Sequence, residues 1–145
     1  METDAQSIVW SRRIEPDINH YMGHVFEIIC KDYLLWKNSR GELPILFTDI
    51  GRWWGTDADS KSQVEIDLIA RENNEYMICE CKWKNEPLDY GVLQSLKKKA
   101  DIFRKSRGKT WYVLFSKSGF TEAVWKEAEI SDNIMLISLD DLYER

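Results

Sequence analysis

The feature that most constrains the fold is a pair of neighbouring strand-like segments, residues 64–70 (VEIDLIA) and 75–82 (EYMICECK). The first alternates β-branched and acidic residues with a period of two, which is typical of a strand. Asn73 and Asn74 separate the segments, and asparagine tolerates the positive φ of a tight turn. The two segments are therefore predicted to form an antiparallel hairpin.

This hairpin brings four ionisable residues together. Counted outward from the asparagine turn, Asp67 is expected to oppose Glu80, and Glu65 to oppose Lys82. Side chains alternate along a strand, so all four are predicted to project from one face. Crowded carboxylates repel one another unless a cation lies between them, and their oxygens suit Mg²⁺ or Mn²⁺. The alternative is a solvated hairpin face with ion pairs of about 0–1 kcal/mol each.

The remaining segments alternate between helix and strand around the hairpin. Apolar spacing and turn residues predict helices over 17–36 and 89–107, and a short helix that is capped by Ser118 or Thr121 and ends at about Glu129. They also predict strands over 44–54, 110–115 and 134–137 and a brief terminal helix. The order α-β-β-β-α-β-α-β-α predicts an α/β fold in which a mixed central sheet is flanked by helices.

The chain of 145 residues is sized for one compact domain. Residues 1–15 lack a clear period and are predicted to be an arm or the remnant of a preceding domain, whereas 16–145 form the domain itself. The sequence contains no apolar run of membrane-spanning length, and its acidic, polar opening does not resemble a signal peptide. We therefore expect a cytoplasmic protein, with no membrane partner and with its three cysteines as reduced core thiols.

The net charge of −5 is unevenly distributed. The segment 97–109 contains seven bases and the single acid Asp101, which gives it +6 and leaves −11 on the rest of the chain. A basic stripe of this kind could lie along a phosphate backbone, and the alternative is a solvated helix face.

Two levels of resemblance follow from these residues. Asp67 followed by Glu80-Cys81-Lys82, after a helix that contains Glu27, resembles the signature of the PD-(D/E)xK, or restriction-endonuclease-like, nuclease superfamily. The ordered blocks YMGHVFE, IGRWW, VEIDLIA, CECKW and FSKSGFT resemble the domain of uncharacterised function at the C-terminus of many archaeal and bacterial AAA-type ATPases. This match spans residues 21–143.

The resemblance implies a restriction-endonuclease-like α-β-β-β-α-β core with a metal site. It makes Asp67 and Glu80 the acids that bind Mg²⁺ or Mn²⁺, adds the backbone carbonyl of Cys81 as a ligand, and makes Lys82 the catalytic lysine. Ile66 stands where the named motif has proline, and many relatives lack that proline.

Further residues are carried over with less support from the motif. Glu27 matches a helical glutamate that many members add to the catalytic site, and Gln94 falls where some carry a glutamine near the metal or DNA. The expected nucleic-acid contacts are Arg52, Gln94, Lys97, Lys98, Lys99 and Arg104.

Two functions of different classes are consistent with this pattern. The first is a Mg²⁺- or Mn²⁺-dependent deoxyribonuclease, with a homodimer and an AAA-type ATPase, fused or separate, as implied partners. The alternative is a non-catalytic DNA-binding or ATPase-docking module that retains the nuclease fold. The Walker A motif G-x-x-x-x-G-K-[ST] does not occur in the sequence, so ATP hydrolysis by this chain is not expected.

Other motifs have simpler interpretations. His20 and His24 could share a metal ion but have no further ligands at zinc-site spacing, so helix-surface histidines are favoured. Arg52-Trp53-Trp54 could stack on bases, although sheet packing is favoured. SKSGFT, residues 116–121, is interpreted as a plain helix start rather than a phosphate site.

Overall fold

The computed structural model describes residues 15–103 and 108–144. The elements follow the predicted order: α2 (Glu15–Ser39), β1 (Asp49–Thr56), β2 (Gln63–Glu72), β3 (Glu75–Lys82), α3 (Tyr90–Phe103), β4 (Thr110–Ser116), α4 (Glu122–Ile130), β5 (Ile134–Ser138) and α5 (Leu139–Tyr143). The predicted arm, residues 1–15, falls almost wholly outside the described residues.

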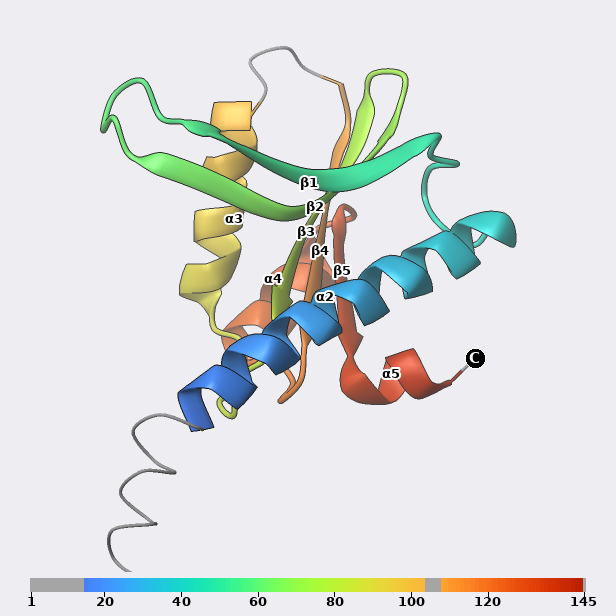
Figure 1. Ribbon diagram of the computed structural model, residues 1–145. Helices are drawn as coiled ribbons and strands as arrows, with labels where there is room; N and C mark the ends of the chain where they lie inside the picture. Colours follow the sequence, from blue (N-terminus) through green and yellow to red (C-terminus); the bar gives the residue numbers. More distant parts are fainter. Residues whose placement is uncertain (1–14, 104–107, 145) are drawn as a thin grey trace, which may run out of the picture.

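The five strands form one mixed sheet in the order β1-β2-β3-β4-β5. The first three strands pair antiparallel, whereas β4 pairs parallel to both β3 and β5. Figure 1 shows that β1 and β2 cross the direction of β3, β4 and β5, so the sheet is strongly twisted. Lys82 pairs with Ser116, which places the carboxyl ends of β3 and β4 side by side.

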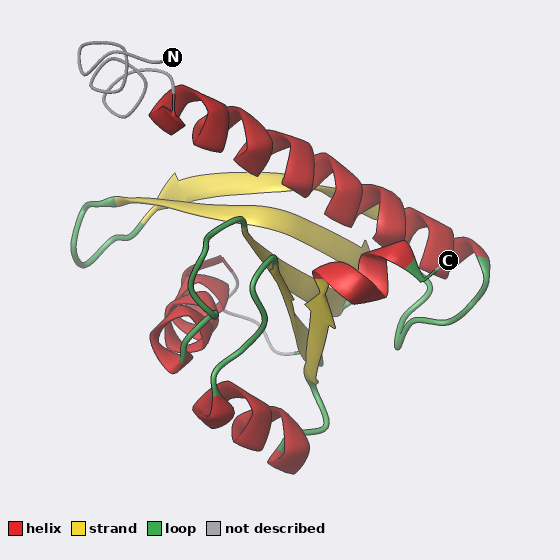
Figure 2. Cartoon of the chain, turned by 90° about the horizontal axis from the view of Figure 1, so that it is seen from below, coloured by secondary structure: helices red, strands yellow, loops and turns green. Residues whose placement is uncertain are grey.

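Helices cover both faces of the sheet, as expected for a layered α/β fold. Figure 2 shows α2 along one face, and α3 and α4 on the other. On the α2 side, Phe26 and Leu34 pack against a buried cluster from the central strands. On the other side, Leu93 and Leu96 of α3 pack with Val124 of α4. Burial of this apolar surface holds the strand ends in place.

Two boundaries differ from the prediction. The strand predicted over 44–54 begins only at Asp49, because the Asn38 side chain exchanges two hydrogen bonds of 3.0 Å with the backbone of Phe47. These two hydrogen bonds hold the segment after α2 as a turn, in which Ile45 and Phe47 are buried. The helix predicted over 89–107 is described up to Phe103, and residues 104–107 lie outside the described part.

The alternation of side chains between the two faces of the sheet changes at Asp67 in β2. Gly51 pairs with Ile69 but Trp53 pairs with Ile66, so two residues of β2 oppose the single residue Arg52. Such a β-bulge reverses which residues face each side of the sheet. Accordingly, Ile66 and Ile69 both join the cluster under α3 and α4, although regular alternation would place them on opposite faces.

Candidate functional site

Glu80 is the buried charge at the centre of the site. It lies near the carboxyl end of β3, on the α3 side, and is only 5% exposed. Its Oε1 lies 3.2 Å from Lys82 Nζ, and its Oε2 lies 3.6 Å from Lys99 Nζ of α3. Burial, together with the charge of Asp67, raises the pKa of Glu80 above its ordinary value despite these two lysines. A carboxylate with this environment attracts further positive charge.

Asp67 occupies the bulge and is tied to the strand that carries Glu80. Its Oδ2 accepts a hydrogen bond of 2.9 Å from the backbone N–H of Cys81. The peptide between Glu80 and Lys82 is thereby fixed to Asp67. The role predicted for the Cys81 carbonyl as a metal ligand stays a prediction.

Glu27 and Glu65 lie on the other side of the sheet, bridged by Arg52. The Arg52 guanidinium donates to Glu27 Oε2 and lies 3.2 Å from Glu65 Oε1. Burial and the charge of Asp67 raise the pKa of Glu27, and Arg52 partly offsets this effect. Asp67 therefore stands between two sub-sites, with Glu80 on the α3 side and Glu27 on the α2 side.

The predicted hairpin register is confirmed only in part. The pairs from Glu72–Glu75 to Leu68–Cys79 are those that the asparagine turn implies. The pairing stops there, so the predicted oppositions of Asp67 to Glu80 and of Glu65 to Lys82 are absent from the described ladder. The prediction that all four side chains share one face was wrong for Glu65, because the bulge turns this residue toward Arg52.

The carboxylates of the site are chemically suited to a hard divalent cation, although their side chains are not arranged as a complete coordination shell. Among the described residues, no three His, Cys, Asp or Glu side chains are arranged to hold a metal ion. Glu80 Oε2 is nevertheless buried without a hydrogen-bond partner. This orphaned carboxylate oxygen, with Asp67 as its neighbour, provides the oxygen chemistry that Mg²⁺ and Mn²⁺ prefer.

The three consecutive lysines of α3 point to different surroundings. Lys97 lies 3.6 Å from Glu127 of α4 and over the Tyr112 ring. Lys98 is exposed, and Lys99 faces Glu80. The lysines therefore do not form a single basic face. Gln94 is exposed near the start of α3, and Arg104, a predicted nucleic-acid contact, lies outside the described residues.

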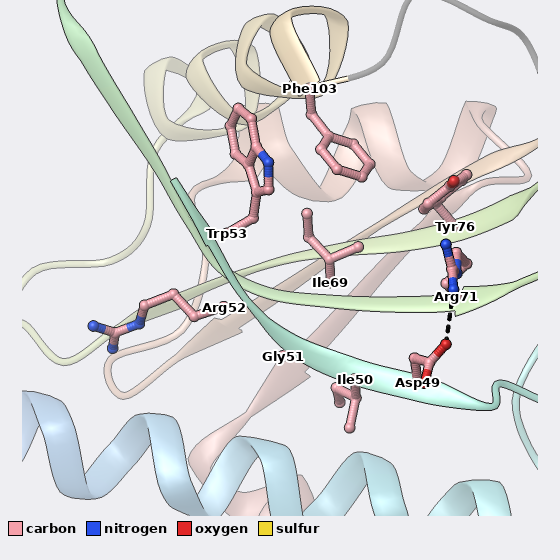
Figure 3. Close-up of a pocket in the computed structure, with 9 residues that line it drawn as sticks. All are labelled: Asp49, Ile50, Gly51, Arg52, Trp53, Ile69, Arg71, Tyr76 and Phe103. Carbon is pink, nitrogen blue, oxygen red and sulfur yellow. Dashed lines mark hydrogen bonds and ion pairs between the residues drawn. The ribbon is translucent and has the colours of Figure 1, made fainter. Parts of the chain in front are cut away.

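The aromatic residues beside Arg52 divide between the two faces of the sheet. Figure 3 shows Trp53 on the α3 side of β1, where its ring lies 5.2 Å from that of Phe103 and lines a cavity of about 290 Å³. This is the sheet packing that we favoured for Trp53. Trp54 is exposed, and the Trp83 ring packs on Phe26 of α2.

The two histidines lie on α2, and residues 116–121 lead into α4. His20 and His24 are exposed on α2, with their Nε2 atoms 3.3 Å apart. Thr121 is the N-cap residue of α4, without a side-chain capping hydrogen bond. In the part of the chain that is described, no helix is both long and apolar enough to cross a membrane.

Three thiols lie behind the site, between α2 and β3: Cys30 and Cys79 are buried, and Cys81 is half-buried. Cys30, Cys79 and Cys81 are all free. A hydrogen bond with Cys30, together with burial, raises the pKa of Cys81 well above its ordinary value. Burial does the same for the pKa of Cys79.

Comparison with known proteins places this architecture in a family. The model of the DUF234 family, described as archaeal and bacterial proteins of unknown function, matches residues 1–101. The chain belongs to this family. The matched part of this DUF234 chain contains Glu27, Asp67, Glu80, Lys82 and Lys99.

One curated relative and one solved structure extend the comparison. The DUF234 chain is 38% identical over 96 residues to the uncharacterized protein MJECL04 of Methanocaldococcus jannaschii, covering 65% of this chain and 20% of that protein. The chain thus spans about one fifth of the length of this relative. The crystal structure of the protein of unknown function AF1548 is similar with a TM-score of 0.53 and 17% identity, covering 80% of this chain and 65% of that chain. This likeness shows the fold alone.

Proposed function

We propose that this DUF234 chain is a Mg²⁺- or Mn²⁺-dependent nuclease that hydrolyses phosphodiester bonds in DNA. The observation that carries the proposal is the environment of Glu80, which is buried, raised in pKa, and has one oxygen without a hydrogen-bond partner. Taking a carboxylate out of water costs free energy even when lysines lie nearby, so a purely structural role does not account for the burial of Glu80. Perturbed carboxylates of this kind are concentrated at functional sites.

Asp67 and Glu80 are the acids that would hold the ion, together with the Cys81 carbonyl. When bound, the ion supplies Lewis-acid polarisation of the scissile phosphate and lowers the pKa of a water molecule. Lys82 lies 3.2 Å from Glu80 and is partly exposed, so its ammonium can both orient an attacking water and stabilise charge on the phosphate. Glu27 is held in place by its ion pair with Arg52 and lies on the α2 side of Asp67.

The proposal includes membership of the PD-(D/E)xK superfamily and an origin as the effector domain of an AAA-type ATPase. Three features support it: the order of the elements, the motif Asp67, Glu80 and Lys82, and the greater length of the Methanocaldococcus jannaschii relative. A homodimer is part of the same proposal.

The test is a cleavage assay on supercoiled, linear, single-stranded and branched DNA with Mg²⁺, Mn²⁺ or EDTA. Lys82→Ala should reduce metal-dependent cleavage by about 10²-fold or more, because removing one positioned electrostatic group typically costs that much. Lys126→Ala is the matched control, since Lys126 is an exposed lysine of α4 that pairs only with Glu122 in the described structure. Equal cleavage by parent and Lys82→Ala would refute the enzyme hypothesis.

A non-catalytic DNA-binding or ATPase-docking module is the second candidate. It is favoured by one observation: the acids are already paired with cations of the chain, Glu27 with Arg52 and Glu80 with Lys82 and Lys99. Such a module would bind DNA or a partner ATPase with the same affinity in EDTA as in Mn²⁺. Metal-independent binding without cleavage of any of the four substrates would establish this alternative.

A further inference from the structure

A cavity of about 390 Å³ opens beside Glu80, between the tip of the β1–β2 hairpin and α3. Figure 1 shows the β1–β2 hairpin extending past α3, and residues of both elements line the cavity. The cavity is lined by Asp57, Ser60, Ser62, Gln63, Val64, Glu65, Ser95, Lys98, Lys99 and Ile102. Most of these side chains are polar, which distinguishes the cavity from the aromatic one beside Trp53.

The hairpin wall is held in shape by its own hydrogen bonds. Asp57 N–H donates to Ser62 O at 2.9 Å, and Lys61 N–H donates to Asp57 O at 2.8 Å. The carboxylate of Asp57 accepts from the Asp59 backbone and the Ser60 hydroxyl. These bonds, together with the nearby charge of Lys98, hold the pKa of Asp57 below its ordinary value. The tip is therefore preformed rather than dependent on a ligand.

The polar groups of the cavity favour an anion. Its two acids are already engaged, Asp57 within its own turn and Glu65 with Arg52. The other polar residues of the lining include Lys98, Lys99 and the serines Ser60, Ser62 and Ser95. Ammonium groups with neighbouring hydroxyls and amides are common phosphate ligands.

Lys99 connects this cavity to the candidate site. It lines the cavity and also lies 3.6 Å from the buried Glu80 Oε2. If one phosphate of a nucleic-acid strand lies beside Lys98, the next group along that strand would therefore reach Lys99 and Glu80. The volume is within the range of small-ligand pockets, roughly 300–1,000 Å³, and so suits a nucleotide-sized segment of one strand rather than the width of a duplex.

We propose that this cavity binds the sugar-phosphate backbone of a single DNA strand and leads it to Glu80, with Lys98 as a phosphate contact and Lys99 shared with the cleavage site. This inference rests on the proposed function and assigns its substrate-binding surface. Lys98 acts only in binding, whereas Glu80 and Lys82 act in the chemistry.

The test measures binding separately from cleavage. Fluorescence anisotropy with a short labelled single-stranded oligonucleotide, in EDTA, should show that Lys98→Gln weakens binding by roughly tenfold, as expected for one charge-assisted contact. The slope of log affinity against log salt should also fall by about 0.7–1, because one fewer phosphate is neutralised. Lys98 is exposed, so this variant should retain the fold.

Two matched lysines test whether position, and not charge alone, determines the effect. Lys126→Gln makes the same charge change on α4 and should bind as the parent does. Lys97→Gln changes the neighbouring residue, which pairs with Glu127 away from the cavity, and should lose much less affinity than Lys98→Gln. An oligonucleotide with uncharged methylphosphonate linkages should abolish the difference between parent and Lys98→Gln.

The outcomes separate this inference from the proposed function. If the parent fails to bind, if Lys98→Gln binds as tightly as the parent, or if Lys97→Gln loses as much affinity, the cavity is not the strand-binding site, even where the parent cleaves DNA. If binding depends on Lys98 but no metal-dependent cleavage occurs, the cavity stands as a binding site and the nuclease proposal fails.

Discussion

Replacing Glu80 with glutamine tests whether this carboxylate is held in the fold at a cost. Glu80→Gln retains the size of the side chain and removes its charge. Because burial and Asp67 raise the pKa of Glu80, the native state favours the neutral carboxyl. The stability associated with that neutral form is fully present below the ordinary pKa of glutamate and is lost as pH rises through the raised pKa of Glu80. The ionised parent should therefore be less stable than the variant at neutral pH.

The size of the effect follows from the exposure of the groups involved. The lysines that lose their partner, Lys82 and Lys99, have side chains that are 30% and 27% exposed, so each lost ion pair costs about 0–1 kcal/mol. Holding an ion away from water costs several kcal/mol. We expect Glu80→Gln to raise the free energy of unfolding at pH 7, without metal, by about 1–2 kcal/mol, or roughly 2–8 °C in Tm.

Urea and thermal unfolding of parent and variant in EDTA, between pH 5 and pH 8, would measure this difference. The stability of the variant relative to the parent should grow as pH rises. A variant that is less stable than the parent by 1 kcal/mol or more at pH 7 would show that the lysine pairs outweigh burial, and the reasoning would be refuted.

Divalent metal should reverse the order of the two proteins. An ion at about 100 times its dissociation constant stabilises a native state by about 2.7 kcal/mol, or roughly 5–11 °C in Tm for a chain of this size. The parent should gain this in Mn²⁺, whereas Glu80→Gln, which lacks one ligand charge, should gain much less. Equal responses of the two proteins to Mn²⁺ would mean that Glu80 is not a ligand.

Two further substitutions test the arrangement around Asp67. Asp67→Asn should lower the pKa of both Glu80 and Glu27, because the charge of Asp67 raises both; side-chain NMR titration measures this, Asp49→Asn is the control, and unchanged values would separate Asp67 from the site. Arg52→Gln should raise the pKa of Glu27 further and lower the free energy of unfolding at pH 7 by about 1–2 kcal/mol, because a charge-assisted hydrogen bond is lost. Side-chain NMR titration measures the pKa, and urea unfolding measures the free energy. An unchanged pKa of Glu27 would show that Arg52 does not interact with it as described.

The element order and half of the hairpin register could be predicted because they depend on local pattern. The asparagine turn fixes the pairing as far as Leu68 and Cys79, and apolar spacing identifies the helices that cover each face. The bulge at Asp67 could not be predicted, because the segment VEIDLIA has the alternation of a regular strand. The extra residue is apparent only from the way β2 pairs with β1. Beyond the bulge the alternation of β2 is shifted by one residue, so Glu65 lies on the face opposite to the one predicted.

The side-chain partners of the site depended on contacts between distant segments. The prediction of Lys99 and Arg52 as nucleic-acid contacts stays a prediction, and the sequence did not show that packing of α3 and α2 pairs them with Glu80 and Glu27. A run of three lysines does not show which of them faces inward. No local signal in residues 57–62 indicates that this polar turn lies opposite α3.

Chemical labelling of the thiols between α2 and β3 would report the rate at which α2, the helix that carries Glu27, detaches from the sheet. Only the thiolate reacts with alkylating reagents, and Cys79 is fully buried with a raised pKa, so this thiol should be almost inert in the docked state. Labelling therefore has to wait for α2 to open. At reagent concentrations where labelling outpaces reclosing, its rate equals the rate at which the structure covering the thiol opens.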